Sequence, residues 1–371
     1  MKTRALLVLF LCSLLLPSVR AAETSITYPA KSGPGHGKHI VFIAGDEEYR
    51  SEEALPMLAK ILSQRHGFKC TVLFSVDPDG TINPNNTKSL SNPEALDTAD
   101  AIVLSMRWRN WPDETMARFE KYLLAGKPII AMRTSTHAFN SISKDSPWAK
   151  WNYNNKGGFG KLVLGETWIN HWARHKIEAT RGIIEPSAKD DPILRGVMDV
   201  FGDSDVYEAY PPDDVKILLR GQALKGMNPA DAPADYKKKR ATDKQEQGIN
   251  DPMMPVAWTR LYKNENGAVN RILCTTMGAA TDFLNEDLRR LIVNGVYWGV
   301  DLPVPARADV TYVDDYQPKL YGATIYGAEK YGPRDFRHGL KVSDHALGKV
   351  LPPGDPKPVQ APAETPAATK P

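Results

Sequence analysis

Short apolar runs alternate with polar stretches of helical spacing along the first third of the chain. Four such runs predict buried strands, at residues 39–44, 68–74, 101–105 and 128–132. Helices are expected at 56–65 and 113–125, and the second carries an apolar stripe of Met116, Phe119, Leu123 and Leu124. Strands that alternate with helices predict an α/β fold, in which a mostly parallel sheet carries helices on both faces.

The same pattern continues less regularly in the second half of the chain. Further strands are expected at 176–179, 215–219, 256–262 and 269–276, followed by a helix from 286 to about 298. The span 38–305 is therefore predicted to be one α/β domain of generous size.

The first 21 residues have the pattern of a secretory signal peptide. Lys2 and Arg4 precede an apolar run that is too short to span a bilayer, and small residues allow cleavage after Ala21. We expect a secreted or periplasmic protein that is not inserted in a membrane once the signal is removed.

Four other segments lie outside the regular pattern. Residues 22–37 form an N-terminal arm, and 306–350 form a C-terminal extension. The tail 351–371 is rich in Pro and Ala and is expected to be disordered. The polar stretch 222–252, with a basic run at 237–240, is expected to be a solvated surface excursion.

Charge and cysteine content narrow the class of protein. Removing residues 1–21 takes away three basic residues and no acid, which leaves 44 basic against 44 acidic residues. This balance, with no basic stripe, argues against nucleic-acid binding. Cys70 and Cys274 each lie in an apolar run, so buried thiols are favoured, with a disulfide left open in an oxidising compartment.

The loops that follow the predicted strands are the candidate site, because ligands bind open parallel sheets at the carboxyl ends of the strands. The first loop is acidic, and the third places Trp108 between Arg107 and Arg109. Such a loop can stack on a sugar and bind its hydroxyls or a carboxylate. The acids have an equal alternative, since carboxylates also stabilise the start of the next helix.

The strand at 128–132 runs into a turn that contains Ser135 and His137. A nucleophile elbow needs small residues two positions from the serine, whereas Arg133 and His137 stand there, so the hydroxyls are expected to cap a helix or line a pocket. His137, at the end of a buried strand, is a candidate general acid or base, and a structural role is equally open.

Neither a metal nor a nucleotide cofactor is predicted. His171 and His175 have the spacing of a helical ligand pair, but Trp172 breaks the zinc-protease motif and no third ligand is close in sequence. His171 remains a pocket candidate. Gly45 is followed by three acids that would repel a pyrophosphate.

Several segments recur in the order and spacing of a known family. They are 40–44, 129–139, 161–165 followed by His171, Asp191-Pro192-Ile193, 205–207, and 255–260 through Met277-Gly278. Over about 38–303 they resemble a ThuA-like (trehalose utilisation) domain, and the runs at 250–255 and 339–345 resemble a secreted bacterial branch of that family.

The resemblance implies a flavodoxin-like three-layer sandwich akin to class I glutamine amidotransferases, and a link to sugar catabolism. Those relatives carry a nucleophilic Cys at the strand-turn, which residues 133–137 lack, so a glutaminase is not expected. His137 and His171 correspond to recurrent family histidines, and Asp205 with Tyr207 to an acidic and aromatic pair.

This chain departs from the family at two positions. Many members have His-Pro-Ile where Asp191-Pro192-Ile193 stands, and Leu-Gly-His where Met277-Gly278-Ala279 stands. Chemistry that requires either histidine is not available to this chain in the usual way.

These observations lead to two hypotheses. The first is an enzyme that acts on a carbohydrate or oxidised sugar, and its predicted catalytic residues are His137, Glu47, Glu48, Asp205 and His171. The predicted substrate-binding residues are Asp46, Tyr49, Arg107, Trp108, Arg133, Thr134, Ser135 and Tyr207. The second is a non-catalytic carbohydrate-binding or scaffold protein, and a Ser135 hydrolase is a weaker third; the oligomeric state stays open.

Overall fold

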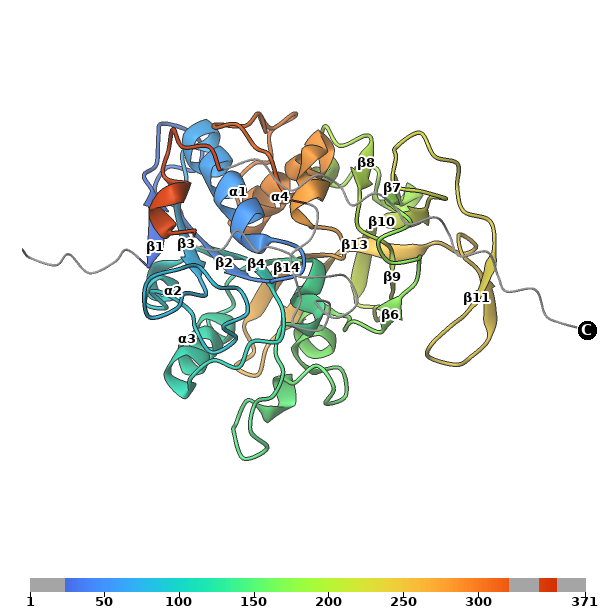
Figure 1. The fold of residues 1–371 in the computed structure, drawn as a ribbon, viewed down its shortest axis with the longest axis horizontal. Coiled ribbons are helices and arrows are strands. Elements are labelled where there is room, and N and C mark those ends of the chain that lie inside the picture. Colours follow the sequence, from blue (N-terminus) through green and yellow to red (C-terminus); the bar gives the residue numbers. More distant parts are fainter. Residues whose placement is uncertain (1–23, 320–339, 352–371) are drawn as a thin grey trace, which may run out of the picture.

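Five parallel strands form the centre of one large sheet (Figure 1). The structure is a computed structural model that describes residues 24–319 and 340–351. The five strands are β2 (His39–Gly45), β3 (Lys69–Phe74), β4 (Ala101–Met106), β5 (Ile129–Met132) and β14 (Val269–Thr275). Their order, β3-β2-β4-β5-β14, is that of flavodoxin-like folds, so the predicted fold class is confirmed.

The sheet continues beyond β14 with antiparallel strands, which the apolar pattern did not distinguish from parallel ones. They are β13 (Met254–Lys263), β10 (Val215–Ala223), β7 (Thr180–Ile184) and β8 (Val200–Gly202). At the opposite edge, β1 (Ser25–Tyr28), part of the N-terminal arm, pairs antiparallel with β3.

The strand predicted at 176–179 is wrong. Glu178 accepts hydrogen bonds from the backbone and guanidinium of Arg174, at 2.8 and 2.9 Å, and from the Tyr236 hydroxyl at 2.7 Å. These bonds hold a turn, and the strand begins only at Thr180.

Helices cover both faces of the parallel strands (Figure 1). α1 (Ser51–His66) and α4 (Glu286–Gly299) lie on one face, and α3 (Asp113–Leu124) with the short α2 (Ala95–Thr98) lies on the other. Side chains of β2 alternate between the two cores: Ile40 and Phe42 pack with α1 and α4, and Val41 and Ile43 with α3. Burial on both faces explains why these strands are continuous apolar runs.

α1 begins five residues before the predicted start and contains Pro56. Glu52 and Glu53 occupy its first turn, where carboxylates favour the positive end of the helix.

The remaining regular elements are short. Two-residue strands β6 (Asn170–His171) and β9 (Tyr207–Glu208) pair with each other, as do β11 (Lys237–Lys239) and β12 (Glu246–Gly248). Single turns of 3-10 helix span Arg133–His137, Ala149–Trp151, Pro186–Ala188, Pro192–Leu194, Ala280–Leu284 and Val342–His345, and a π turn spans Gly160–Leu164.

The excursion at 222–252 is an ordered hairpin rather than a fully solvated loop. Ala234 and Ile249 are buried, and the Asn250 amide bonds to the backbone of Ala223 and Ala234. Lys238, inside the basic run, donates to the carbonyl oxygens of His171 and Trp172. The excursion therefore supports the segment that carries His171.

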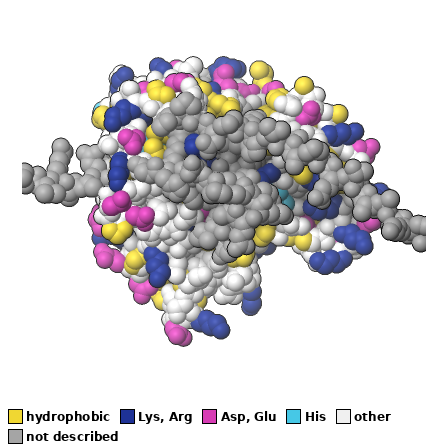
Figure 2. Space-filling view, viewed as in Figure 1, with side chains coloured by type: hydrophobic (Ala, Val, Ile, Leu, Met, Phe, Trp, Pro, Cys, Tyr) yellow, Lys and Arg dark blue, Asp and Glu magenta, His cyan; other side chains and the backbone are white. Residues whose placement is uncertain are grey.

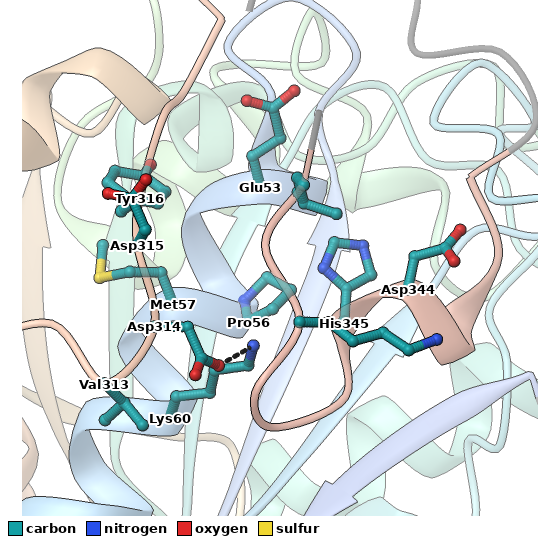
Figure 3. A pocket seen from close by; sticks show the side chains of 12 residues that line it. Glu53, Pro56, Met57, Lys60, Val313, Asp314, Asp315, Tyr316, Asp344 and His345 are labelled. Carbon is teal, nitrogen blue, oxygen red and sulfur yellow. Dashed lines mark hydrogen bonds and ion pairs between the residues drawn. The ribbon is translucent and has the colours of Figure 1, made fainter. Parts of the chain in front are cut away.

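The described parts of the C-terminal extension pack against β1 and α1. The Tyr28 hydroxyl donates to the carbonyl of His345, and Lys60 on α1 pairs with Asp314 at 2.5 Å. Together they leave a cavity of about 40 Å³ lined by α1 and both described pieces of the extension (Figure 3). A space of this size holds water rather than a sugar.

Other expectations concern surface and thiols. Cys70 on β3 and Cys274 on β14 are buried and free, and β2, β4 and β5 lie between their strands.

On the visible face, basic and acidic side chains are interspersed (Figure 2). In the described ranges, no helix combines the length and apolarity needed to cross a membrane. The predicted signal peptide and all but Leu351 of the tail lie outside the described residues.

A buried charge cluster at the start of α1 yields a pH-dependent prediction. Arg50 is fully buried and donates to Glu53 at 2.8 Å, whereas its Nε lies 3.6 Å from Glu52. Burial raises the pKa of Glu52 from 4.5 to about 8. The folded protein thus keeps Glu52 protonated where the unfolded chain ionises it, so the free energy of unfolding falls as pH rises from 4.5 to about 8.

We expect Glu52→Gln to flatten this fall, measured by urea unfolding at several pH values, and to be no less stable than the parent at pH 8. Glu53→Gln is the matched control, because it removes the carboxylate from Arg50 and should cost about 3 kcal/mol. Equal losses for both variants at pH 8 would contradict the assignment.

Candidate active site

The candidate site lies where the strand order reverses, between β2 and β4. These neighbours run parallel, and β5 follows β4, so their carboxyl ends share one edge. The loops 46–50, 107–111 and 133–137 leave the sheet at this edge. Ligands of open α/β sheets bind at the carboxyl ends of the strands where the strand order reverses, so this is the expected position of a site.

Arg107 binds two of the three acids of the first loop. It forms an ion pair with Glu47 and donates to Glu48 at 2.5 Å. Burial opposes the charge of Arg107, but the two carboxylates outweigh it and raise the pKa of Arg107 above its ordinary value. Glu47 and Glu48, both predicted as catalytic residues, are thus paired with a guanidinium.

Arg133, in the loop that follows β5, is the centre of a second buried cluster. Its φ of 40° is unusual for a residue with a side chain, and the turn lets the guanidinium reach inward. It donates to the carbonyl oxygens of Asp205 and Thr276, to the Tyr49 hydroxyl at 3.0 Å and to the Asp205 carboxylate at 2.8 Å. The guanidinium carbon also lies 4.4 Å from the ring centre of Tyr49 and 3.8 Å from that of Tyr207.

Asp205 joins this guanidinium to two imidazoles. Its carboxylate oxygens lie 2.8 Å from Nδ1 of His171 and 2.9 Å from Nδ1 of His175. Burial would raise the pKa of Asp205, but the charge of Arg133 and the imidazoles hold it well below its usual range. The β6–β9 pairing, which sets His171 opposite Tyr207, places this histidine beside Asp205.

His175 connects the Arg107 cluster, through Glu48, with the Arg133 cluster, through Asp205. Its Nε2 lies 3.2 Å from Glu48 and its Nδ1 2.9 Å from Asp205. Both partners are ionised acceptors, so in this arrangement both ring nitrogens carry protons. Burial opposes this charge, but the hydrogen bonds to Asp205 and Glu48 raise the pKa of His175 above its ordinary value. The sequence indicated His175 only as half of a metal pair, so His175 was not among the predicted site residues.

His137 lies in a ring of aromatic side chains. Its ring centre is 6.2 Å from Trp108, 6.1 Å from Tyr153, 5.5 Å from Trp168 and 6.4 Å from Tyr207. Burial, and then the charge of Arg107, lowers the pKa of His137 well below its usual value, so the imidazole is neutral.

The aromatic ring connects His137 with the Asp205 cluster. Trp168 and Tyr207 also contact His171, with ring centres 5.7 and 5.5 Å away. Trp108, Tyr153 and Trp168 are partly exposed. Tyr153 and Trp168 were not predicted as site residues because neither follows a predicted strand. The available signal was that Trp168 lies three residues before His171, which was predicted.

Five predicted substrate-binding residues are fully buried supports instead: Asp46, Tyr49, Arg133, Thr134 and Ser135. Asp46 accepts from the backbone of Glu48 and Tyr49 and from the Thr134 hydroxyl, which joins the loops after β2 and β5. Burial raises its pKa to about 6. The Ser135 hydroxyl donates to the carbonyl of Leu104 at 3.1 Å, so it is not placed as a nucleophile.

Two further expectations are corrected or refined. Trp111, which follows Trp108 in the same loop and was expected to stack on a sugar with it, is buried in the α3 core against Phe119 and Phe139. At the positions where family histidines are missing, Ala279 is buried, and Asp191 caps a 3-10 turn and pairs with Lys216.

One group of side chains in the described part of the chain has the make-up of a metal site. Ligand atoms of His171, His175 and Asp205 all lie within 4.8 Å of one another. No metal was predicted because no third ligand was near in sequence. That reason does not hold, since the fold brings in Asp205 from 30 residues beyond His175.

Comparison with known proteins gives one family. The model of the ThuA family, described as trehalose utilisation, matches residues 39–299. A ThuA-like protein structure from Parabacteroides merdae is 15% identical, covers 74% of this chain and 90% of its own, and has a TM-score of 0.42. One from Bacteroides uniformis is 17% identical, with coverage of 73% and 94% and a TM-score of 0.43. None of the curated proteins matches the chain.

The buried guanidinium of Arg133 gives a direct test of the site's architecture. We expect Arg133→Lys to lower the free energy of unfolding by about 3 kcal/mol, because an ammonium cannot make the forked contacts and leaves buried acceptors unsatisfied. Urea unfolding measures the change.

Arg174→Lys is the matched control. Its side chain is 59% exposed and pairs with Glu178, so the change should cost less than about 1 kcal/mol. Equal effects of the two substitutions would show that Arg133 is not the support described.

Proposed function

Because the chain belongs to the ThuA family, we propose that it acts on a carbohydrate derivative, a sugar or keto sugar, with His137 as the proton-transfer group. The observation that carries the proposal is a neutral imidazole, ringed by partly exposed aromatic side chains, at the carboxyl edge of the sheet. The predicted signal peptide makes export part of the same proposal.

The aromatic side chains suit a sugar ring. Pyranose rings present apolar C–H faces that stack on indole and phenol rings, and Trp108, Tyr153 and Trp168 approach His137 from three separate segments. The guanidinium of Arg107 lies 4.3 Å from the centre of the Trp108 ring and stabilises its orientation.

A neutral His137 is suited to proton transfer at a sugar carbon or carbonyl. Since burial keeps it unprotonated, the imidazole can accept a proton at neutral pH or donate its ring N–H to a carbonyl oxygen. Its Nδ1 lies 3.3 Å from the Thr136 hydroxyl, which orients the ring and leaves Nε2 for substrate.

A second function, sugar binding without turnover, is favoured by one observation. The two positions where many family members carry histidine hold Ala279 and Asp191, and neither supplies an imidazole. A chain that had lost the family's chemistry would keep the aromatic surface.

The test is incubation of the mature protein with disaccharides, their keto derivatives and sugar acids, with thermal shift for binding and mass spectrometry for product. We expect His137→Gln to lower turnover at least about 100-fold while binding persists. Unchanged turnover in this variant would remove His137 from the mechanism, and binding without product in the parent would establish the second function.

A matched pair of tyrosine substitutions tests the aromatic side chains around His137. Tyr153→Ala should weaken sugar binding. Tyr262→Ala should not, because Tyr262 pairs with Asn270 near the start of β14, at the amino ends of the parallel strands and away from the site. Both tyrosines are partly buried, so equal losses would indicate a general effect on folding.

A further inference from the structure

We propose that His171, His175 and Asp205 bind a divalent first-row transition-metal ion. Two imidazoles and one carboxylate form a ligand set suited to zinc, manganese or ferrous ions, with coordination positions left for substrate or water. The proposal goes beyond the proposed function, and metal binding itself does not depend on it.

The two imidazoles and the carboxylate already face one another. Nδ1 of His171 and Nδ1 of His175 lie 2.8 and 2.9 Å from different oxygens of Asp205. The candidate ligand atoms all lie within 4.8 Å of one another. Ligands about 2.1 Å from one ion lie about 3.0 to 3.4 Å from one another, so side-chain shifts on the order of 1 Å would let the three residues share an ion. The protons on the two Nδ1 atoms would leave to solvent as the ion takes their place.

The surroundings of the three residues are those of metal ligands. A ligating histidine usually donates its second ring nitrogen to a carboxylate, and Nε2 of His175 lies 3.2 Å from Glu48. Asp205 is held from behind by Arg133 at 2.8 Å. Lys238 fixes the backbone of His171 with a 2.6 Å hydrogen bond to its carbonyl.

The cluster is also accessible. The side chains of His171 and His175 are 28% and 23% exposed, whereas Asp205 is buried beneath them. Their ring centres lie 4.1 Å apart, so the two imidazoles lie against each other.

The ion would complement His137. Trp168 and Tyr207 lie beside both His137 and His171, so the two centres adjoin the same aromatic pair. An ion at the cluster would polarise a keto or hydroxyl oxygen of the sugar while His137 moves the proton. This last step rests on the proposed function.

The experiment is a titration of chelator-treated, dialysed mature protein with Co²⁺, followed by visible absorption, and with Zn²⁺, followed by calorimetry. We expect one ion per chain and visible bands characteristic of mixed nitrogen and oxygen ligands. His171→Ala should weaken binding at least about 100-fold, since loss of a supporting partner alone costs about 10- to 100-fold. His171→Asn provides a second variant, and circular dichroism checks the fold of each.

The controls separate this site from the rest. His36→Ala changes an exposed histidine and should leave the affinity unchanged. His137→Gln should bind the ion as the parent does, so a failure of metal binding and a failure of the His137 mechanism are distinguishable. Millimolar binding only, or an affinity that neither His171 variant alters, would overturn the metal site.

Discussion

The buried ion pair between Arg133 and Asp205 is the constraint on which the candidate site depends. Neither side chain is exposed, and their closest atoms lie 2.8 Å apart. Burying two charges is unfavourable unless their remaining lone pairs and protons find partners. Here two carbonyls, a tyrosine hydroxyl and two imidazoles supply them for all but the Nε of Arg133. Because Arg133 follows β5 and Asp205 follows β8, the pair joins the parallel centre of the sheet to its antiparallel extension.

Around this pair the site has two layers. The lower one consists of buried polar side chains that hold loops: Asp46 joins the turns after β2 and β5, and Asp282 binds Ser204 and the backbone of Gly278 and Ala279. The upper one consists of partly exposed aromatic rings, the partly exposed imidazoles of His171 and His175, and the buried imidazole of His137. Rigid support beneath accessible groups is the arrangement that chemistry on a bound ligand requires.

The sequence predicted the parts of this site that depend on local pattern. The apolar runs of β2, β4 and β5 located the carboxyl edge, and with it Arg107, Trp108 and His137. The pairing of residues distant in sequence was not predictable in this way: His175 meets Glu48 across 127 residues and Asp205 across 30. Burial by residues distant in sequence was not predictable either. Five residues next to predicted strand ends were therefore predicted to contact substrate, whereas they are fully buried and support the loops. Strands were predicted within β10 and β13, but their antiparallel direction was not, because an apolar run does not encode strand direction.

A double-mutant cycle on Arg133 and Asp205 tests the central claim most directly. Arg133→Met, Asp205→Leu and the double variant would be compared by urea unfolding. If the pair organises the site, each single change leaves a buried charge unpaired, and the double variant loses at least about 2 kcal/mol less than the sum of the two. Losses that add within about 0.5 kcal/mol would show that the two residues act independently and would contradict the account.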